Sequence, residues 1–200
     1  MSDRSMAPDG SIRQPTPGRM ADLAASVWPP GVVGQGADGL RAYMLVDAAR
    51  NPEIHGMLVR HQDAVPIRCL YQGELAEQLA DVSPYIVALE RGAVLVDWLL
   101  REGWGDGWGV IVHSPLDLDD ARRHFRRFTV VNTEDGRTLL FRFYDPRVLR
   151  VFLPTCDRGQ LDQLFRGVVR YMTEDEGGAV LRRFEWHDGQ LHQLPQPLRE

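Results

Sequence analysis

The stretch of sequence that decides the fold covers residues 138–153 and reads TLLFRFYDPRVLRVFL. Its first half alternates large apolar and polar residues, which is typical of a half-buried strand. Its second half spaces apolar residues at helical intervals, at Val148, Leu149, Phe152 and Leu153. We therefore predict a central strand that runs directly into a helix.

The junction between these two elements contains Asp145 and Pro146. An aspartate caps a helix when its side chain accepts a hydrogen bond from an early backbone N–H. Proline suits the first helical turn because the N–H groups of that turn have no partner within the helix. Arg142 and Arg147 flank this cap, so opposite charges are concentrated where they can pair with one another or with a partner protein.

The composition is that of an ordinary globular protein with one domain, or one domain and a small appendage. The chain has 200 residues, 44% of them hydrophobic and 26% charged, and a net charge of −5, which disfavours a dedicated nucleic-acid binder. Cys69 and Cys156 lie far apart without metal-ligand spacing, so we expect buried thiols in a reducing compartment. The sequence has no apolar run long enough for a membrane span and no apolar signal core, so we expect neither a membrane location nor secretion by a signal peptide.

Strand and helix patterns alternate along most of the chain. Strand patterns cover 41–47, 65–71, 85–89, 109–113 and 130–132, and helical patterns cover 21–28, 52–58, 74–79, 93–101, 118–128 and 160–169. A terminal hairpin is expected around Asp188 and Gly189, between 180–187 and 190–194. The prediction is an α/β (α+β) fold with a mixed sheet and flanking helices, and with a possible division into two lobes near residue 115 or 155.

We divide the chain into three parts on this basis. Residues 1–38 are expected to form a disordered tail (1–20), a short helix and a loop, because the tail is rich in Ser, Pro, Gly, Asp and Arg and has no periodicity. Residues 39–175 form the main domain, and residues 176–200 form a C-terminal hairpin extension.

Candidate catalytic residues are few. His113 and Ser114 follow a strand pattern, and with Asp145 they would suit a small hydrolase if the three side chains converge. The plainer interpretation, which we favour, is a strand that ends in a turn at Pro115. No metal site is predicted, because the aspartates near residue 118 lack the glycine and distal glutamate of a calcium loop.

Two further features suggest binding. Arg122, Arg123, Arg126 and Arg127 alternate with Phe125 and Phe128, which would suit a nucleic-acid-binding helix, although solvated or paired arginines over a phenylalanine core are favoured. Trp104 and Trp108 lie in a Gly-rich loop. They are either a surface anchor for a partner, because large aromatic residues dominate interface energetics, or the cover of a core edge.

The motifs, taken in order, resemble the family of type VI secretion effector adaptors, also called effector chaperones (Tap or TEC proteins). The resemblance extends over residues 42–174. Its motifs are Tyr43-x-Leu45-x-Asp47-Ala48-Ala49, Pro52-Glu53, Leu70-Tyr71-x-Gly73, Ser83-Pro84-Tyr85-Ile86-Val87, Trp98 with Gly103-x-Gly105, Trp108-Gly109 leading to His113-Ser114, Phe125-Arg126-Arg127-Phe128, and Phe141-Arg142-Phe143-Tyr144-Asp145-Pro146-Arg147-Val148-Leu149.

This resemblance implies a cytoplasmic protein that is not an enzyme and needs no cofactor. Such adaptors bind a toxic effector and help to load it onto the VgrG spike, without nucleic acid or membrane as a partner. The motif match points to Arg142, Tyr144, Asp145 and Arg147 as partner-binding residues, together with the candidate anchors Trp104 and Trp108. Pairing of Arg142 with Asp145 inside the fold is an equally good interpretation. The resemblance leaves the effector and the oligomeric state open.

Overall fold

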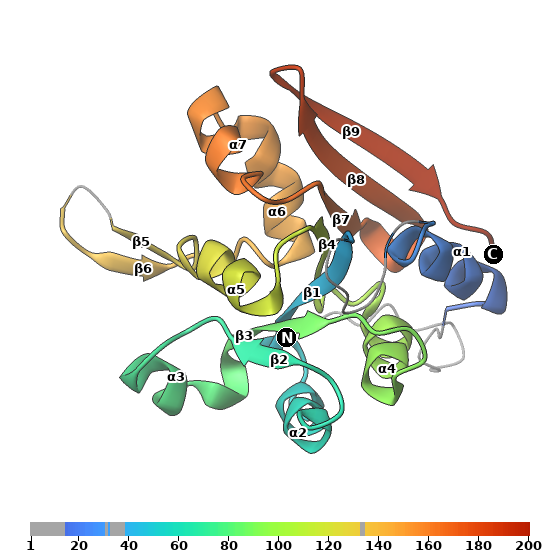
Figure 1. The fold of residues 1–200 in the computed structure, drawn as a ribbon, viewed down its shortest axis with the longest axis horizontal. Helices are drawn as coiled ribbons and strands as arrows, with labels where there is room; N and C mark the ends of the chain where they lie inside the picture. Colours follow the sequence, from blue (N-terminus) through green and yellow to red (C-terminus); the bar gives the residue numbers. More distant parts are fainter. Residues whose placement is uncertain (1–14, 31, 33–38, 133–134) are drawn as a thin grey trace.

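A seven-stranded sheet forms the centre of the molecule (Figure 1). The computed structural model describes residues 15–30, 32, 39–132 and 135–200. The strand order is β2 (Ile67–Cys69), β3 (Pro84–Ala88), β1 (Arg41–Asp47), β4 (Gly109–Ser114), β7 (Arg170–Glu174), β8 (Val180–His187) and β9 (Gln190–Pro197). The predicted α/β (α+β) class is confirmed, but each pairing in this sheet is antiparallel, whereas a mixed sheet was expected.

Helices cover both faces of the sheet. One face packs against α1 (Pro17–Val27), α2 (Glu53–His61) and α4 (Val94–Gly103), and the other packs against α5 (Leu118–Arg126), α6 (Pro146–Phe152) and α7 (Arg158–Leu164). Strand β1 shows why: Met44 and Val46 belong to the first core, whereas Tyr43 and Leu45 belong to the second. Successive side chains of a strand point to opposite faces, so an almost wholly apolar strand needs a cover on both sides.

Shorter elements complete the chain. They are α3 (Glu74–Gln78) and the 3-10 helices η1 (Ala48–Arg50), η2 (Ala80–Val82), η3 (Leu153–Thr155) and η4 (Glu176–Gly178). β4 and β7 are hydrogen-bonded neighbours although residues 115 and 155 both lie between them in the sequence. The sheet is therefore continuous across both positions where a division into lobes was considered.

The strand predicted in the first half of residues 138–153 is present, but it is shorter than expected and does not lie at the centre of the fold. Only β6 (Thr138–Leu140) is a strand, and it pairs with β5 (Val130–Asn132) in a separate two-stranded sheet at the periphery (Figure 1). The chain turns directly afterwards, where the Asp145 N–H donates to the Arg142 carbonyl at 3.0 Å. Phe143 and Tyr144 are both buried, and two consecutive buried side chains do not fit the alternation of a half-exposed strand.

The predicted helix after this turn is confirmed. It is α6, and Asp145 Oδ1 caps it by accepting a hydrogen bond from the Arg147 backbone N–H at 2.9 Å. Just before α2, Asn51 Oδ1 accepts a hydrogen bond from the Glu53 N–H at 2.9 Å.

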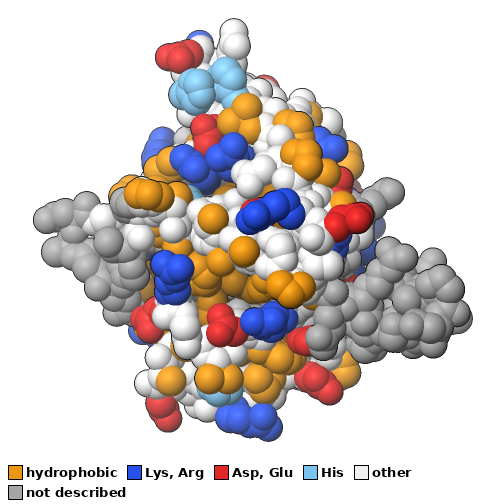
Figure 2. Space-filling view, turned by 90° about the vertical axis from the view of Figure 1, so that its right-hand side faces the viewer, with side chains coloured by type: hydrophobic (Ala, Val, Ile, Leu, Met, Phe, Trp, Pro, Cys, Tyr) orange, Lys and Arg blue, Asp and Glu red, His pale blue; other side chains and the backbone are white. Residues whose placement is uncertain are grey.

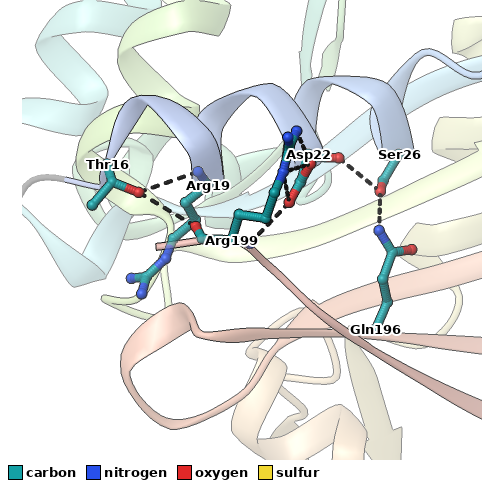
Figure 3. A network of polar contacts seen from close by, with 6 residues as sticks. All are labelled: Thr16, Arg19, Asp22, Ser26, Gln196 and Arg199. Atoms are coloured by element: carbon teal, nitrogen blue, oxygen red, sulfur yellow. Dashed lines mark hydrogen bonds and ion pairs between the residues drawn. The ribbon is translucent and has the colours of Figure 1, made fainter.

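The two ends of the described chain bind one another (Figure 3). The Asp22 carboxylate of α1 accepts hydrogen bonds from the Arg199 backbone and guanidinium, and Ser26 Oγ accepts from Gln196 Nε2 at 3.2 Å. We call Thr16, Asp22, Ser26, Gln196 and Arg199 the terminal clamp. The expected disorder of residues 1–14 lies outside the described residues, whereas α1 begins at Pro17, before the predicted start at residue 21.

The predicted terminal hairpin is confirmed as β8 and β9, and β8 continues the main sheet by pairing with β7. Histidine side chains gather at the tip of this hairpin, where the rings of His187 and His192 stack 3.9 Å apart (Figure 2). Over the rest of the face in Figure 2, acidic, basic and hydrophobic side chains are interspersed.

Candidate functional site

Three buried acidic residues and several arginines meet at one end of the sheet. Asp47 is the last residue of β1 and Glu174 is the last residue of β7, and antiparallel pairing through β4 brings both to the same sheet end. The third acid is Asp145, before α6. We call the set of Asp47, Asp145, Glu174, Arg50, Arg142, Arg147 and Arg150 the carboxylate–arginine cluster.

Asp145 and Arg147 form a bidentate ion pair. Arg147 Nε donates to Asp145 Oδ1 at 3.0 Å and Nη2 donates to Oδ2 at 2.5 Å. Burial acts to raise the pKa of Asp145, but the hydrogen bonds from the Arg147 side chain and backbone outweigh it, so this pKa lies below its usual value. Asp145 therefore stays ionised and holds the Arg147 guanidinium in one orientation.

The sequence left open whether Arg142 pairs with Asp145, and the structure pairs it with Asp47 instead. Arg142 Nη1 lies 3.4 Å from Asp47 Oδ2 and forms an ion pair with it. This oxygen accepts no hydrogen bond from the described residues. The other oxygen, Oδ1, accepts from the Ala49 N–H. Burial raises the pKa of Asp47, and the positive charge of Arg142 only partly offsets this effect.

Both ion pairs place the anion inside and the cation outside. The side chains of Asp47 and Asp145 are 0% and 5% exposed, whereas those of Arg142 and Arg147 are 48% and 55% exposed. A molecule that approaches this surface therefore meets two oriented guanidinium groups and no accessible carboxylate from either pair.

Glu174 fixes the loop between α4 and β4. Its two carboxylate oxygens accept hydrogen bonds from the backbone N–H groups of Gly105 and Gly107, at 2.5 and 2.6 Å. Burial raises the pKa of Glu174 to about 7, although these two hydrogen bonds act in the opposite direction. The loop is held a second time by Arg50, whose Nη2 donates to the Asp106 carbonyl at 3.1 Å.

Gly107 shows how closely the loop and the arginines approach one another. Its φ of +71° is a left-handed conformation that favours glycine, and a Cβ there would lie 3.6 Å from Arg50 Nη2 and 3.8 Å from Arg147 Nε. Arg150 also contacts this region, because it donates a hydrogen bond to the Glu174 backbone carbonyl. The cluster thus joins β1, η1, the α4–β4 loop, α6 and β7 into one rigid support for Arg142 and Arg147.

The other predicted binding residues are buried. Tyr144 is 1% exposed, and its hydroxyl lies 3.4 Å from that of Tyr71. Trp104 donates from Nε1 to the Gly178 carbonyl at 2.9 Å, and Trp108 packs on Trp98 with ring centroids 4.9 Å apart. Both loop tryptophans belong to the core, so the interpretation as a core cover is correct and neither is a surface anchor in this conformation.

The side chains of the hydrolase alternative, His113, Ser114 and Asp145, do not point toward one another. His113 Nε2 makes a hydrogen bond of 2.9 Å with the Val27 carbonyl of α1, and Ser114 Oγ donates to the Gly167 carbonyl at 2.5 Å. These neighbours on β4 reach toward opposite faces of the sheet, as consecutive strand residues do. The third residue, Asp145, accepts its hydrogen bonds from Arg147 and not from His113. Burial lowers the pKa of His113 to about 4, so its ring is neutral at pH 7.

Three of the four arginines in and just after α5 have partners within the fold. Arg122 donates to the carbonyls of Cys69 and Tyr71, Arg123 pairs with Asp120, and Arg127 lies over the Phe128 ring. Phe125 is fully buried. This arrangement agrees with the structural interpretation of the helix and leaves no row of unengaged cations for a phosphate backbone.

Other site types find little support in the described part of the chain. No group of three or more His, Cys, Asp or Glu side chains there could hold a metal ion, and none of the described helices has the length and apolar character of a membrane span. Cys69 and Cys156 are unpaired and half-buried rather than buried as expected, and burial raises the pKa of Cys156 to about 11.

Comparison with known proteins identifies the domain. Residues 42–163, more than half of the chain, match a family described as a domain of unknown function, DUF4123. The chain belongs to the DUF4123 family. Curated proteins and solved structures give no match. The DUF4123 region begins in β1 and ends in α7, so it includes Asp47, Arg142, Asp145 and Arg147 but excludes Glu174 and the terminal clamp.

Sequence reasoning missed Asp47, Arg50 and Glu174 as members of the site. Asp47 carried one usable signal, since it is a charged residue that directly follows the apolar run 42–46. The position of Glu174 beside residues 105–107 depends on strand order, which local periodicity does not contain.

Proposed function

We propose that this DUF4123 protein is a non-enzymatic adaptor that binds a type VI secretion effector and helps to load it onto the VgrG spike. The motifs that resemble effector adaptors run through the same residues as the family match, 42–163. The proposal includes a cytoplasmic location, where an effector would be met before secretion.

The observation that carries this proposal is the orientation of Arg142 and Arg147. Their carboxylate partners are buried while about half of each arginine side chain remains exposed. Oriented arginines are common anchors of protein interfaces, because the planar guanidinium recognises carboxylates through two parallel hydrogen bonds. The placement of His113 and Ser114 toward opposite faces of the sheet supports the adaptor over the hydrolase alternative.

The experiment is co-production of the tagged chain with any effector and VgrG protein whose genes adjoin its own, followed by affinity capture and size-exclusion chromatography. We expect a stable complex of the chain with the effector. The double variant R142Q/R147Q should capture at least about ten-fold less effector, because each lost arginine contact at an interface costs on the order of 1 kcal/mol or more.

The matched control is R91Q/R101Q, which removes two exposed arginines beside and on α4, on the opposite side of the sheet. It should capture as much effector as the wild type. Failure of the wild-type chain to bind either neighbouring protein would contradict the proposed function, as would turnover of a substrate by the purified chain.

A further inference from the structure

The β5–β6 hairpin exposes aliphatic side chains on both of its faces. Four of the six strand residues are Val or Leu, and Val130, Val131, Leu139 and Leu140 are 36–47% exposed. Val130 pairs with Leu140 and Val131 pairs with Leu139, so each face of the ribbon carries one aliphatic pair. A two-stranded ribbon alone is marginally stable in water, and an exposed apolar patch of this kind marks an interaction site.

The outer strands of the main sheet are protected, unlike this hairpin. Strand β9 contains Pro195 and Pro197, which lack the N–H that another strand would need. At the other edge, Arg122 Nε already donates to the Cys69 carbonyl of β2 at 2.7 Å. The hairpin instead projects from the body of the molecule (Figure 1). The chain thus blocks pairing at its large sheet and offers apolar surface at its small one.

This hairpin is continuous with the surface that presents the arginines. Phe141, directly after β6, packs edge-to-face on Phe152 of α6 with ring centroids 4.8 Å apart. Val151, the neighbour of Phe152, is 70% exposed. Arg147 lies four residues before Val151 on α6, so both lie on the same face of this helix.

The charge of this surface selects the partner. The acids of the two ion pairs are inside the protein, whereas Arg142 and Arg147 extend into solvent. Arg147 uses Nε and Nη2 for Asp145, so Nη1 keeps N–H donors that can reach a second carboxylate. A segment with apolar residues alone would offer no carboxylate to the solvent-facing N–H donors of these arginines, and a basic segment would be repelled by their positive charge.

We propose that the hairpin β5–β6 and the outer face of α6 form one docking surface for a polypeptide segment of another protein that combines aliphatic with acidic side chains. The aliphatic side chains cover the exposed valines and leucines, and the carboxylates bind Arg142 and Arg147. Identification of that other protein as the effector rests on the proposed function, but the chemistry of the segment does not.

The test selects binders from a phage-displayed library of random short peptides on the immobilised full chain, without reference to any effector. We expect enrichment of peptides that contain Asp or Glu next to Leu, Ile, Val or Phe. Binding of a synthetic copy of an enriched peptide is then measured by fluorescence anisotropy. R142Q and at least one of V131S/L139S and V130S/L140S should bind it at least about ten-fold more weakly than the wild type, because the two aliphatic pairs lie on opposite faces of the ribbon. The affinity of the peptide should also fall as salt is added.

The matched control is V94S, which removes a 68% exposed valine at the start of α4, and it should bind the peptide as the wild type does. Unchanged thermal melting of each variant shows that a loss of binding is not a loss of folding. The proposal is overturned by no enrichment, by enrichment without an acidic bias, or by peptide binding that the hairpin variants do not weaken. If both hairpin variants bind the effector as the wild type does, the proposed docking surface is wrong, but the adaptor function is not contradicted.

Discussion

The carboxylate–arginine cluster and the terminal clamp use the same pair of residue types at different depths. In the cluster, Asp47 and Asp145 are buried and each organises an arginine that faces solvent. In the clamp, several hydrogen bonds join Asp22 to Arg199 (Figure 3). Both of these side chains reach solvent, because Asp22 is 18% exposed and Arg199 is 71% exposed. Removal of a buried member of an ion pair is costly, whereas exposed pairs contribute little. The cluster should therefore be a structural requirement, and the clamp a weak closure of the chain ends.

The pH dependence of Glu174 gives the largest expected effect in the cluster. Its pKa is raised to about 7 from an ordinary value of 4.5, so its contribution to stability is full below pH 4.5 and is lost as the pH rises through 7. We expect that loss to reach about 3 kcal/mol at most. Urea unfolding of the wild type and E174Q between pH 4.5 and pH 8 measures this loss, and the wild type should lose stability relative to the variant as the pH rises. A difference in the free energy of unfolding that stays constant with pH would show that Glu174 does not titrate in this range.

His113 should give a pH dependence of the opposite sign where α1 is held. Burial lowers its pKa to about 4 from 6.5, so its contribution is present above pH 6.5 and is lost as the pH falls through 4. The loss is at most about 3 kcal/mol. We expect the wild type to lose stability relative to H113Q on acidification, with early exchange of the amide protons of α1. Equal slopes for both proteins would contradict the assignment.

Removal of the Asp145 side chain should have a smaller but still large effect. The variant D145A loses the cap of α6 and the partner of Arg147, and we expect a loss of about 2 kcal/mol in the free energy of unfolding. The variant D145N keeps an oxygen for the cap but removes the charge, so it should lose less. If both variants melt like the wild type, Asp145 is not a structural residue.

The smallest effect is expected in the terminal clamp. Substitution D22N removes an exposed ion pair, so the melting temperature should change little at low salt and not measurably at high salt. A decrease in melting temperature as large as that of D145A would break the contrast between the two regions.

Much of the fold follows from local sequence signals. The apolar strand 41–47, the Asp145-Pro146 helix start and the Asp188-Gly189 hairpin were predictable, because caps, turns and periodicity act over a few residues. The stretch 138–153 shows the limit. Residues 138–140 do form a strand, but the alternating residues Phe141, Arg142 and Phe143 lie outside it, because the chain turns to bury Phe143 and Tyr144.

The candidate site was predictable only in part, for a related reason. Arg142, Asp145 and Arg147 are sequence neighbours, and their importance could be seen from the cap and the charges. The partner of Arg142 is Asp47, almost a hundred residues earlier, and the loop with Trp104 and Trp108 is held by Glu174 from β7. These contacts depend on the order of strands in the sheet. The burial of both tryptophans likewise depends on packing between layers, so the sequence alone left a surface anchor and a core cover as equal alternatives.

The most direct test of the account is hydrogen–deuterium exchange of the full chain with and without an effector captured in the co-production experiment. The account predicts slower exchange in residues 129–152, which include β5, β6 and α6, and little change in α4 or at the terminal clamp. Slower exchange confined to α4, the clamp or the β8–β9 hairpin, with residues 129–152 unchanged, would contradict the claim that partners bind at the surface presenting Arg142 and Arg147.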